Sequence, residues 1–217
     1  MAKRQFKAES KRLLDLMVNS IYTHKEIFLR EIISNASDAC DKLCYQALTD
    51  DAVGMSRKDF KIEIKVDKEH RTLTVSDNGI GMDKEDLENN LGVIASSGSY
   101  KFKQEVGDDA KDTDVIGQFG VGFYSAFMVA DHITVVTRKY GTDAAWMWQS
   151  SGADGYTITE CERDAVGTDI IMHIKPDTDD EKYSEFLESW RLQELVRKYS
   201  DYIRFPIRME VSKTRRK

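Results

Sequence analysis

Alternation of apolar and polar side chains is the feature that most constrains the fold of this 217-residue chain. Over residues 60–66 apolar and charged residues alternate strictly, and alternation returns over residues 72–76 after a polar turn. A period of two is typical of strands that bury one face and expose the other. The two segments therefore predict a β-hairpin that leads the chain to Asp77.

Further segments are rich in β-branched and aromatic residues and are bounded by turn residues, as strands usually are. We expect strands at residues 5–8, 133–138, 145–149, 156–161 and 168–174, and extended chain at residues 205–211.

Apolar residues at helical spacing predict helices at both ends of the chain. One is expected over residues 10–21. The sequence Thr23-His24-Lys25-Glu26 matches a capping box and predicts the start of a second helix, which runs toward Leu48. About residues 180–203 are expected to be helical, with a core-facing stripe made of Phe186, Trp190, Leu195 and Tyr199.

Two shorter helices are expected between the strands. Asp83 can cap a short helix that ends at Leu91. A buried helix is expected to follow the glycine-rich loop at residue 117 and to end at residue 130. Antiparallel strands with helices grouped between them predict an α+β two-layer sandwich, in which helices cover one face of a sheet.

Composition is compatible with a single domain over residues 1–217. Hydrophobic residues make up 41% of the chain, and no internal repeat or linker divides it. The formal net charge of −6 repels a phosphate backbone on average, so nucleic acid is not an expected partner. The most apolar run, residues 121–130, is too short to span a bilayer, and the polar start does not resemble a secretory signal.

The chain has three cysteines, which is an odd number. Cys40 and Cys44 lie four residues apart and share a helix face with apolar residues, so we expect reduced thiols in the core. A metal site would need further ligands, and no histidine lies near them in the sequence. These features predict a cytoplasmic protein without membrane attachment.

The first candidate site lies on the second predicted helix. Glu31, Asn35, Asp38 and Lys42 fall within a stripe about 60° wide, opposite an apolar face. The simple alternative is an amphipathic helix whose polar stripe faces water. If the stripe lines a cleft, the Asn35 amide oxygen suits Mg²⁺, which uses few protein ligands. Glu31 can then orient or deprotonate a water beside a terminal phosphate.

The second candidate site is the segment Asp77-Asn78-Gly79-Ile80-Gly81-Met82. An aspartate that leaves a strand into Asn-Gly is also compatible with a plain turn. The second glycine favours a binding site, because two glycines let a flat ring approach the backbone closely. A carboxylate there can accept a hydrogen bond from the exocyclic amine of adenine, whereas guanine presents a carbonyl at that position.

The third candidate site is the segment Gly117-Gln118-Phe119-Gly120-Val121-Gly122-Phe123. A helix that opens after glycines presents free N–H groups and a positive dipole end to phosphate. The spacing matches neither the dinucleotide G-x-G-x-x-G pattern nor a P-loop, and a tightly packed glycine-rich helix is the alternative. Together the three segments could hold a base, a metal and a phosphate chain, so ATP with Mg²⁺ is the expected ligand.

Two stretches resemble signatures of the ATPase family shared by gyrase B, histidine kinases, MutL and the heat-shock protein 90 chaperones. They are Phe28-Leu29-Arg30-Glu31-Ile32-Ile33-Ser34-Asn35-Ala36-Ser37-Asp38-Ala39 and Ile116-Gly117-Gln118-Phe119-Gly120-Val121-Gly122-Phe123-Tyr124-Ser125. Both are most similar to the heat-shock protein 90 family. The match runs from Phe6 to Pro206, so the chain resembles the N-terminal nucleotide-binding domain of a bacterial member.

The resemblance implies a Bergerat fold, with ATP held between helices on a mostly antiparallel sheet of about eight strands. It implies that Glu31 activates water with Arg30 beside it, that Asn35 binds Mg²⁺ and that Asp77 contacts adenine. Thr168 would share a water with the adenine. Further nucleotide contacts are implied at Asp38, Lys42, Gly81, Met82, Asn90, Ser96, Ser97, Gly117, Gln118, Phe119, Gly120, Val121, Gly122 and Phe123.

The resemblance also implies how the domain works in a longer protein. About residues 92–122 would form a lid over ATP, and a strand near Phe6 would exchange between protomers of a homodimer. Middle and C-terminal domains, client proteins and co-chaperones belong to the full-length protein. This domain alone is expected to be monomeric and to hydrolyse ATP very weakly.

The chain departs from the family pattern in the predicted lid. The family commonly has lysine and threonine where this chain has Ser96 and Ser99, which puts one polar nucleotide contact and the lid closure in question. Two other functions stay open at this stage. One is a binding module in which nucleotide only switches a partner surface, and the other is a DNA-linked relative of gyrase B or MutL.

Overall fold

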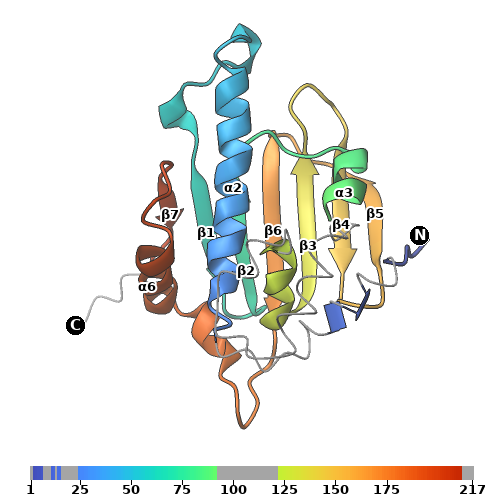
Figure 1. The fold of residues 1–217 in the computed structure, drawn as a ribbon, viewed down its shortest axis with the longest axis vertical. Coiled ribbons are helices and arrows are strands. Elements are labelled where there is room, and N and C mark those ends of the chain that lie inside the picture. Colours follow the sequence, from blue (N-terminus) through green and yellow to red (C-terminus); the bar gives the residue numbers. More distant parts are fainter. Residues whose placement is uncertain (1, 7–10, 13, 16–23, 92–121, 212–217) are drawn as a thin grey trace.

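Seven strands form one sheet in the computed structural model, which describes residues 2–6, 11–12, 14–15, 24–91 and 122–211 (Figure 1). The order across the sheet is β5-β4-β3-β6-β2-β1-β7. Neighbouring strands are antiparallel except β1 and β7, which are parallel. The bounds are β1 (Ile62–Asp67), β2 (Thr72–Asp77), β3 (Ala130–Arg138), β4 (Ala145–Ser150), β5 (Tyr156–Cys161), β6 (Gly167–Ile174) and β7 (Ile207–Met209).

In place of the strand expected at residues 5–8, the structure has a single antiparallel β-bridge, which joins Arg4 to Tyr156 at the start of β5. Arg4 and Tyr156 exchange two backbone hydrogen bonds, of 2.8 and 2.9 Å. Residues 7 and 8 of that predicted strand lie outside the described residues. The described part of the chain therefore has seven strands and one bridge instead of eight strands, and the predicted mostly antiparallel α+β architecture is confirmed.

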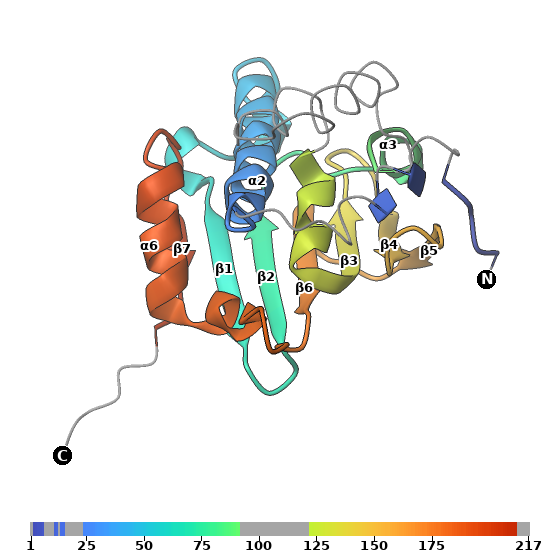
Figure 2. The same ribbon diagram turned by 60° about the horizontal axis from the view of Figure 1, so that its bottom comes forward.

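Helices lie on one face of the sheet. Figures 1 and 2 show α2 and η3 side by side on this face, with α6 near the β1–β7 edge and α3 near β4. The helix bounds are α2 (Ile27–Gln46), α3 (Lys84–Asn90) and α6 (Ser189–Tyr199), and the 3₁₀ segments are η1 (Asp51–Val53), η2 (Arg57–Asp59), η3 (Gly122–Met128) and η4 (Tyr183–Leu187).

The core lies between this helical layer and the sheet. Strand residues that face the helices are buried, whereas β1 turns Glu63 and Lys65 to the exposed outer face, as the alternation predicts. Apolar residues of α2 pack on the same core. The buried core includes Phe28, Ile32, Ile33, Ile64, Val75, Phe127, Val135, Trp148, Met172 and Leu195.

Three expectations about helices differ from the structure. Helix α2 begins at Ile27 with Glu26 as N-cap and no side-chain cap, while Thr23 of the predicted capping box lies outside the described residues. The stripe predicted over residues 180–203 is interrupted, because Glu188 has extended backbone angles between η4 and α6. This break changes the helical phase, so Trp190 is 64% exposed instead of buried and Leu192 faces the core. The segment after Gly122 is a buried 3₁₀ helix.

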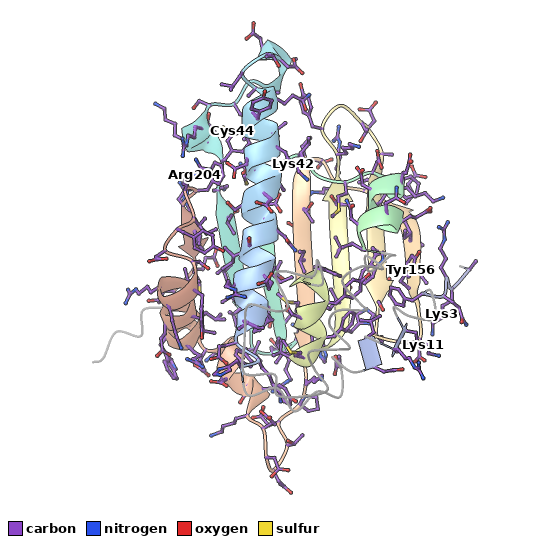
Figure 3. All side chains as sticks on the ribbon, viewed as in Figure 1. Lys3, Lys11, Lys42, Cys44, Tyr156 and Arg204 are labelled. Carbon is purple, nitrogen blue, oxygen red and sulfur yellow. The ribbon has the colours of Figure 1, made fainter. Side chains whose placement is uncertain are left out.

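The described residues include no helix that is long and apolar enough to cross a membrane. The three cysteines are free thiols, and Cys40 is fully buried as predicted. Burial raises the pKa of Cys40 to about 12. Figure 3 shows Cys44 and Lys42 on opposite sides of α2, so the helix has one apolar side and one polar side at this level.

Candidate functional site

A cavity of about 480 Å³ lies beside α2, above the inner face of β2, β6 and β3. This volume is typical of pockets for small molecules and cofactors. Its described lining residues are Glu31, Asn35, Ala36, Asp38, Ala39, Lys42, Asp77, Ile80, Gly81, Met82, Asp86, Asn90, Leu91, Gly122, Phe123, Val135, Lys139, Thr168 and Ile170.

One side of the cavity, which we call the helix wall, consists of Glu31, Asn35, Asp38 and Lys42 on α2. The opposite face of α2 is buried, which holds this polar stripe toward the cavity. The structure thus brings the four side chains together. Burial raises the pKa of Asp38, while the neighbouring Lys42 ammonium acts in the opposite direction.

Glu31 stands where α2 meets the start of η3. Its Oε1 accepts two hydrogen bonds from the Arg30 guanidinium, at 3.1 Å from Nε and 2.9 Å from Nη2. A Cβ on Gly122 would lie 2.5 Å from Oε2 of Glu31, so a larger residue there would push the carboxylate aside. Arg30 itself does not line the cavity; it reaches the site through Glu31. The arrangement fixes the carboxylate by one of its two oxygens.

The other side of the cavity, which we call the base wall, consists of the segment 77–82 together with Thr168. Asp77 ends β2 and is 8% exposed. Burial raises the pKa of Asp77 to about 7, although the Gly79 N–H donates a 2.9 Å hydrogen bond to its Oδ1. A carboxyl with this pKa holds a proton far more easily near neutral pH than an exposed aspartate does.

The glycines of the base wall allow close packing of its backbone against neighbouring elements. A Cβ on Gly79 would overlap the backbone of Ala39 in α2, and a Cβ on Gly81 would overlap the backbone of Arg138. Gly81 also has a positive φ of 70°. The two glycines therefore let the loop pack against α2 and the end of β3.

Sequence reasoning missed Thr137, which supports the base wall from behind. Asp77, Thr168 and Thr137 are directly opposite one another on β2, β6 and β3. The Thr137 Oγ1 accepts the Met82 N–H at 2.9 Å and lies 2.9 Å from the Thr168 Oγ1. Its burial in a strand pattern is ordinary for threonine, so the sequence contained no signal that could separate it from a core position.

The comparisons with known proteins bear on this cavity. A family model described as histidine kinase-, DNA gyrase B-, and HSP90-like ATPase matches residues 22–168. The matched segment contains both walls and covers more than half of the chain. The chain belongs to this ATPase family.

Curated relatives of this ATPase chain carry the name chaperone protein HtpG. The protein from Clostridium acetobutylicum is 60% identical over 218 aligned residues, which cover 100% of this chain and 35% of the relative. The protein from Bacillus subtilis is 60% identical over 213 residues, 98% of this chain and 34% of the relative. The one from Clostridium perfringens is 59% identical over 216 residues, 99% of this chain and 34% of the relative. The chain spans about a third of the length of these relatives.

The described lining of the cavity is more acidic than basic, with four acidic residues and two lysines. The described residues include no group of three or more His, Cys, Asp or Glu that could hold a metal by themselves. Hard oxygen donors such as the Asn35 amide fit Mg²⁺, which completes its shell with water and phosphate oxygens.

The remaining predicted site residues divide into two groups. Gly81, Met82, Asn90, Gly122 and Phe123 line the cavity. Residues 96, 97 and 117–121 lie outside the described residues, as does nearly all of the predicted lid segment.

Proposed function

We propose that this chain binds ATP and ADP together with Mg²⁺ and that it hydrolyses ATP slowly. The observation that carries the proposal is the position of Asp77, a buried carboxyl at the closed side of a cavity of about 480 Å³. An exocyclic amine of adenine would donate to this carboxylate and would favour its ionised form. Membership of the ATPase family supports the same ligand.

In the proposed complex, the adenine lies against the base wall and the phosphates lie along the helix wall. Asn35 would hold Mg²⁺, which when bound neutralises charge on the phosphate oxygens. Glu31 would orient a water and accept its proton through an oxygen that Arg30 does not hold. Gly122 leaves space beside that oxygen, and the acidic lining excludes phosphate that arrives without its cation.

The relatives support a wider role. Their name, chaperone protein HtpG, supports a chaperone function. We propose that the full-length protein remodels client proteins and does so in the cytoplasm. In the full-length protein, ATP would drive lid closure over residues 92–122 and clamping of a homodimer, with co-chaperones as further partners. This 217-residue chain by itself would be monomeric and would turn ATP over very weakly.

The test is a calorimetric titration of Mg·ADP into the purified chain, with Asp77→Asn alongside. We expect one-to-one binding by the wild type and loss of binding by a folded Asp77→Asn. The matched control is Asp143→Asn, because the Asp143 side chain is fully exposed and lies outside the cavity lining. Wild-type affinity in Asp77→Asn would refute the adenine contact, and absence of binding by a folded wild type would refute the proposed ligand.

The Arg30–Glu31 pair favours a second candidate function, in which nucleotide switches the conformation without hydrolysis. Arg30 donates two hydrogen bonds to the Oε1 of Glu31, so this oxygen is already engaged and is not free to accept a proton from water. Glu31→Ala in the full-length protein distinguishes the two functions. We expect ADP binding to persist and turnover to disappear. Unchanged turnover would show that Glu31 is not the residue that activates water.

A further inference from the structure

An ion-paired lysine lies at the rim of the cavity, at a position to which the sequence analysis gave no role. Lys139 directly follows β3, and its Nζ is 2.9 Å from Asp83 Oδ2 and 2.7 Å from Asp86 Oδ2. These two hydrogen-bonded carboxylates raise the pKa of Lys139. Lys139 and Asp86 both line the cavity, so the ion pairs form part of its wall.

The two aspartates are the capping box of α3. The Asp83 Oδ1 accepts the Asp86 N–H at 2.9 Å, and the Asp86 Oδ2 accepts the Asp83 N–H at 3.1 Å. Lys139 therefore connects the end of β3 to both members of the cap that starts α3. Because α3 also carries Asn90 at the cavity, this connection links a cavity-lining helix to the end of β3.

Lys139 supplements neutral contacts between the same two segments. The Tyr140 N–H donates to the Ile80 carbonyl at 2.8 Å, and the Met82 N–H donates to Thr137 Oγ1 at 2.9 Å. These contacts hold residues 80–82, whereas Lys139 contacts Asp83 and Asp86, which follow them in the chain. It is the contact that extends from the end of β3 to the cap of α3.

We propose that Lys139 is a positioning residue for nucleotide binding, which holds the α3 cap against β3 and thereby shapes the purine side of the cavity. The inference rests on the proposed function, since it names a further residue for the same ligand. It concerns the base and not the phosphates: the lysine is attached to the loop that follows Asp77. A fully exposed ion pair usually contributes little to stability. The side chains of Lys139, Asp83 and Asp86 are each only about one third exposed, so water screens their ion pairs less.

The test compares Lys139→Met with Lys139→Arg in the 217-residue chain. Methionine keeps the apolar stem and removes the charge, while arginine keeps the charge. We expect the dissociation constant for Mg·ADP to rise roughly three- to tenfold in Lys139→Met, and to stay near the wild-type value in Lys139→Arg. Lys65→Met is the matched control, because Lys65 lies on the exposed outer face of β1.

Two further measurements separate positioning from other effects. Adenosine without phosphates should lose the same fold of affinity as Mg·ADP, and amide exchange over residues 80–91 should be faster in the free Lys139→Met protein. If Lys139→Met loses affinity for Mg·ADP but not for adenosine, the inference is overturned, because Lys139 would then act on the charge of the phosphates. Unchanged binding in Lys139→Met would also overturn it. Failure of the wild type to bind Mg·ADP would instead reject the proposed function, and this inference with it.

Discussion

The base wall is held by backbone contacts, whereas the helix wall offers its groups as side chains on a regular helix. Residues 79–82 pack so closely on α2 and β3 that two positions have no room for a Cβ. In contrast, Asn35 and Lys42 project from α2 about two turns apart and constrain the backbone little. Substitutions in the base wall should therefore disturb folding and binding together, while those in the helix wall should change binding alone.

The largest expected effect is at Gly79. A Cβ there overlaps the Ala39 backbone, which cannot move without displacing α2. We expect Gly79→Ala to lower the free energy of unfolding by about 3 kcal/mol or more. Gly141→Ala is the control, because Gly141 has a positive φ of 81° but open space around it, and should lose only about 1 kcal/mol. Equal losses in urea denaturation would contradict the close approach.

The second prediction concerns the pH dependence of stability. The pKa of Asp77 is about 7 in the folded protein and has an ordinary value of 3.8 when exposed. Between these values the unfolded chain releases the proton and the folded chain keeps it, so stability falls as pH rises from 4 to 7. Relative to Asp77→Asn, the wild type should lose up to about 4 kcal/mol over this range. The free energies of unfolding of the two proteins can be measured by urea denaturation across pH 4.5–8. A constant difference between them over this range would show that Asp77 is not buried as described.

A smaller effect is expected in the helix wall, at Asn35. We expect Asn35→Ala to remove the Mg²⁺ dependence of ADP binding, which corresponds to a roughly tenfold weaker affinity in the presence of Mg²⁺. Its unfolding curve should match the wild type. Asn89→Ala is the control, because Asn89 is exposed on α3 and is not part of the cavity lining. A preserved Mg²⁺ dependence in calorimetry would move the metal to other ligands.

The smallest effect is expected for Thr137→Val, which keeps the shape of the side chain but removes its hydroxyl. The Met82 N–H then loses its acceptor, and stability should fall by about 1–2 kcal/mol with a modest loss of ADP affinity. Thr134→Val is the matched control, because its hydroxyl makes only a 3.4 Å contact with Gln149. If both variants have the same melting temperature, Thr137 does not support the base wall.

The sequence predicted the parts of the fold that follow from local pattern. Strict alternation located β1 and β2 to within one or two residues, and Asp83 caps α3 as predicted. Trp190 was placed wrongly because a helical phase was continued through Glu188, where the backbone is extended. Such a break depends on how η4 and α6 pack in the folded domain, and no local sequence pattern predicts it.

The site was predictable where function requires unusual residues in regular structure. The polar stripe of α2 contains poor helix formers, and this marked it in the sequence. Thr137 and Lys139 could not be predicted in the same way. Both acquire their partners from β3 meeting the β2–α3 loop, and this proximity arises only when strands far apart in the sequence become neighbours.

The tryptophans of the chain differ sharply in environment, and one of them lies close to the cavity. Trp148 is fully buried, and its ring centroid lies 5.4 Å from that of Phe123, which lines the cavity. Trp190 is largely exposed. Since indole emission shifts to shorter wavelength in apolar surroundings, Trp148 and Trp190 should emit at opposite ends of the tryptophan band. A protein in which Trp146 and Trp190 are both replaced by Phe would therefore carry one tryptophan, separated from the cavity by a single aromatic ring.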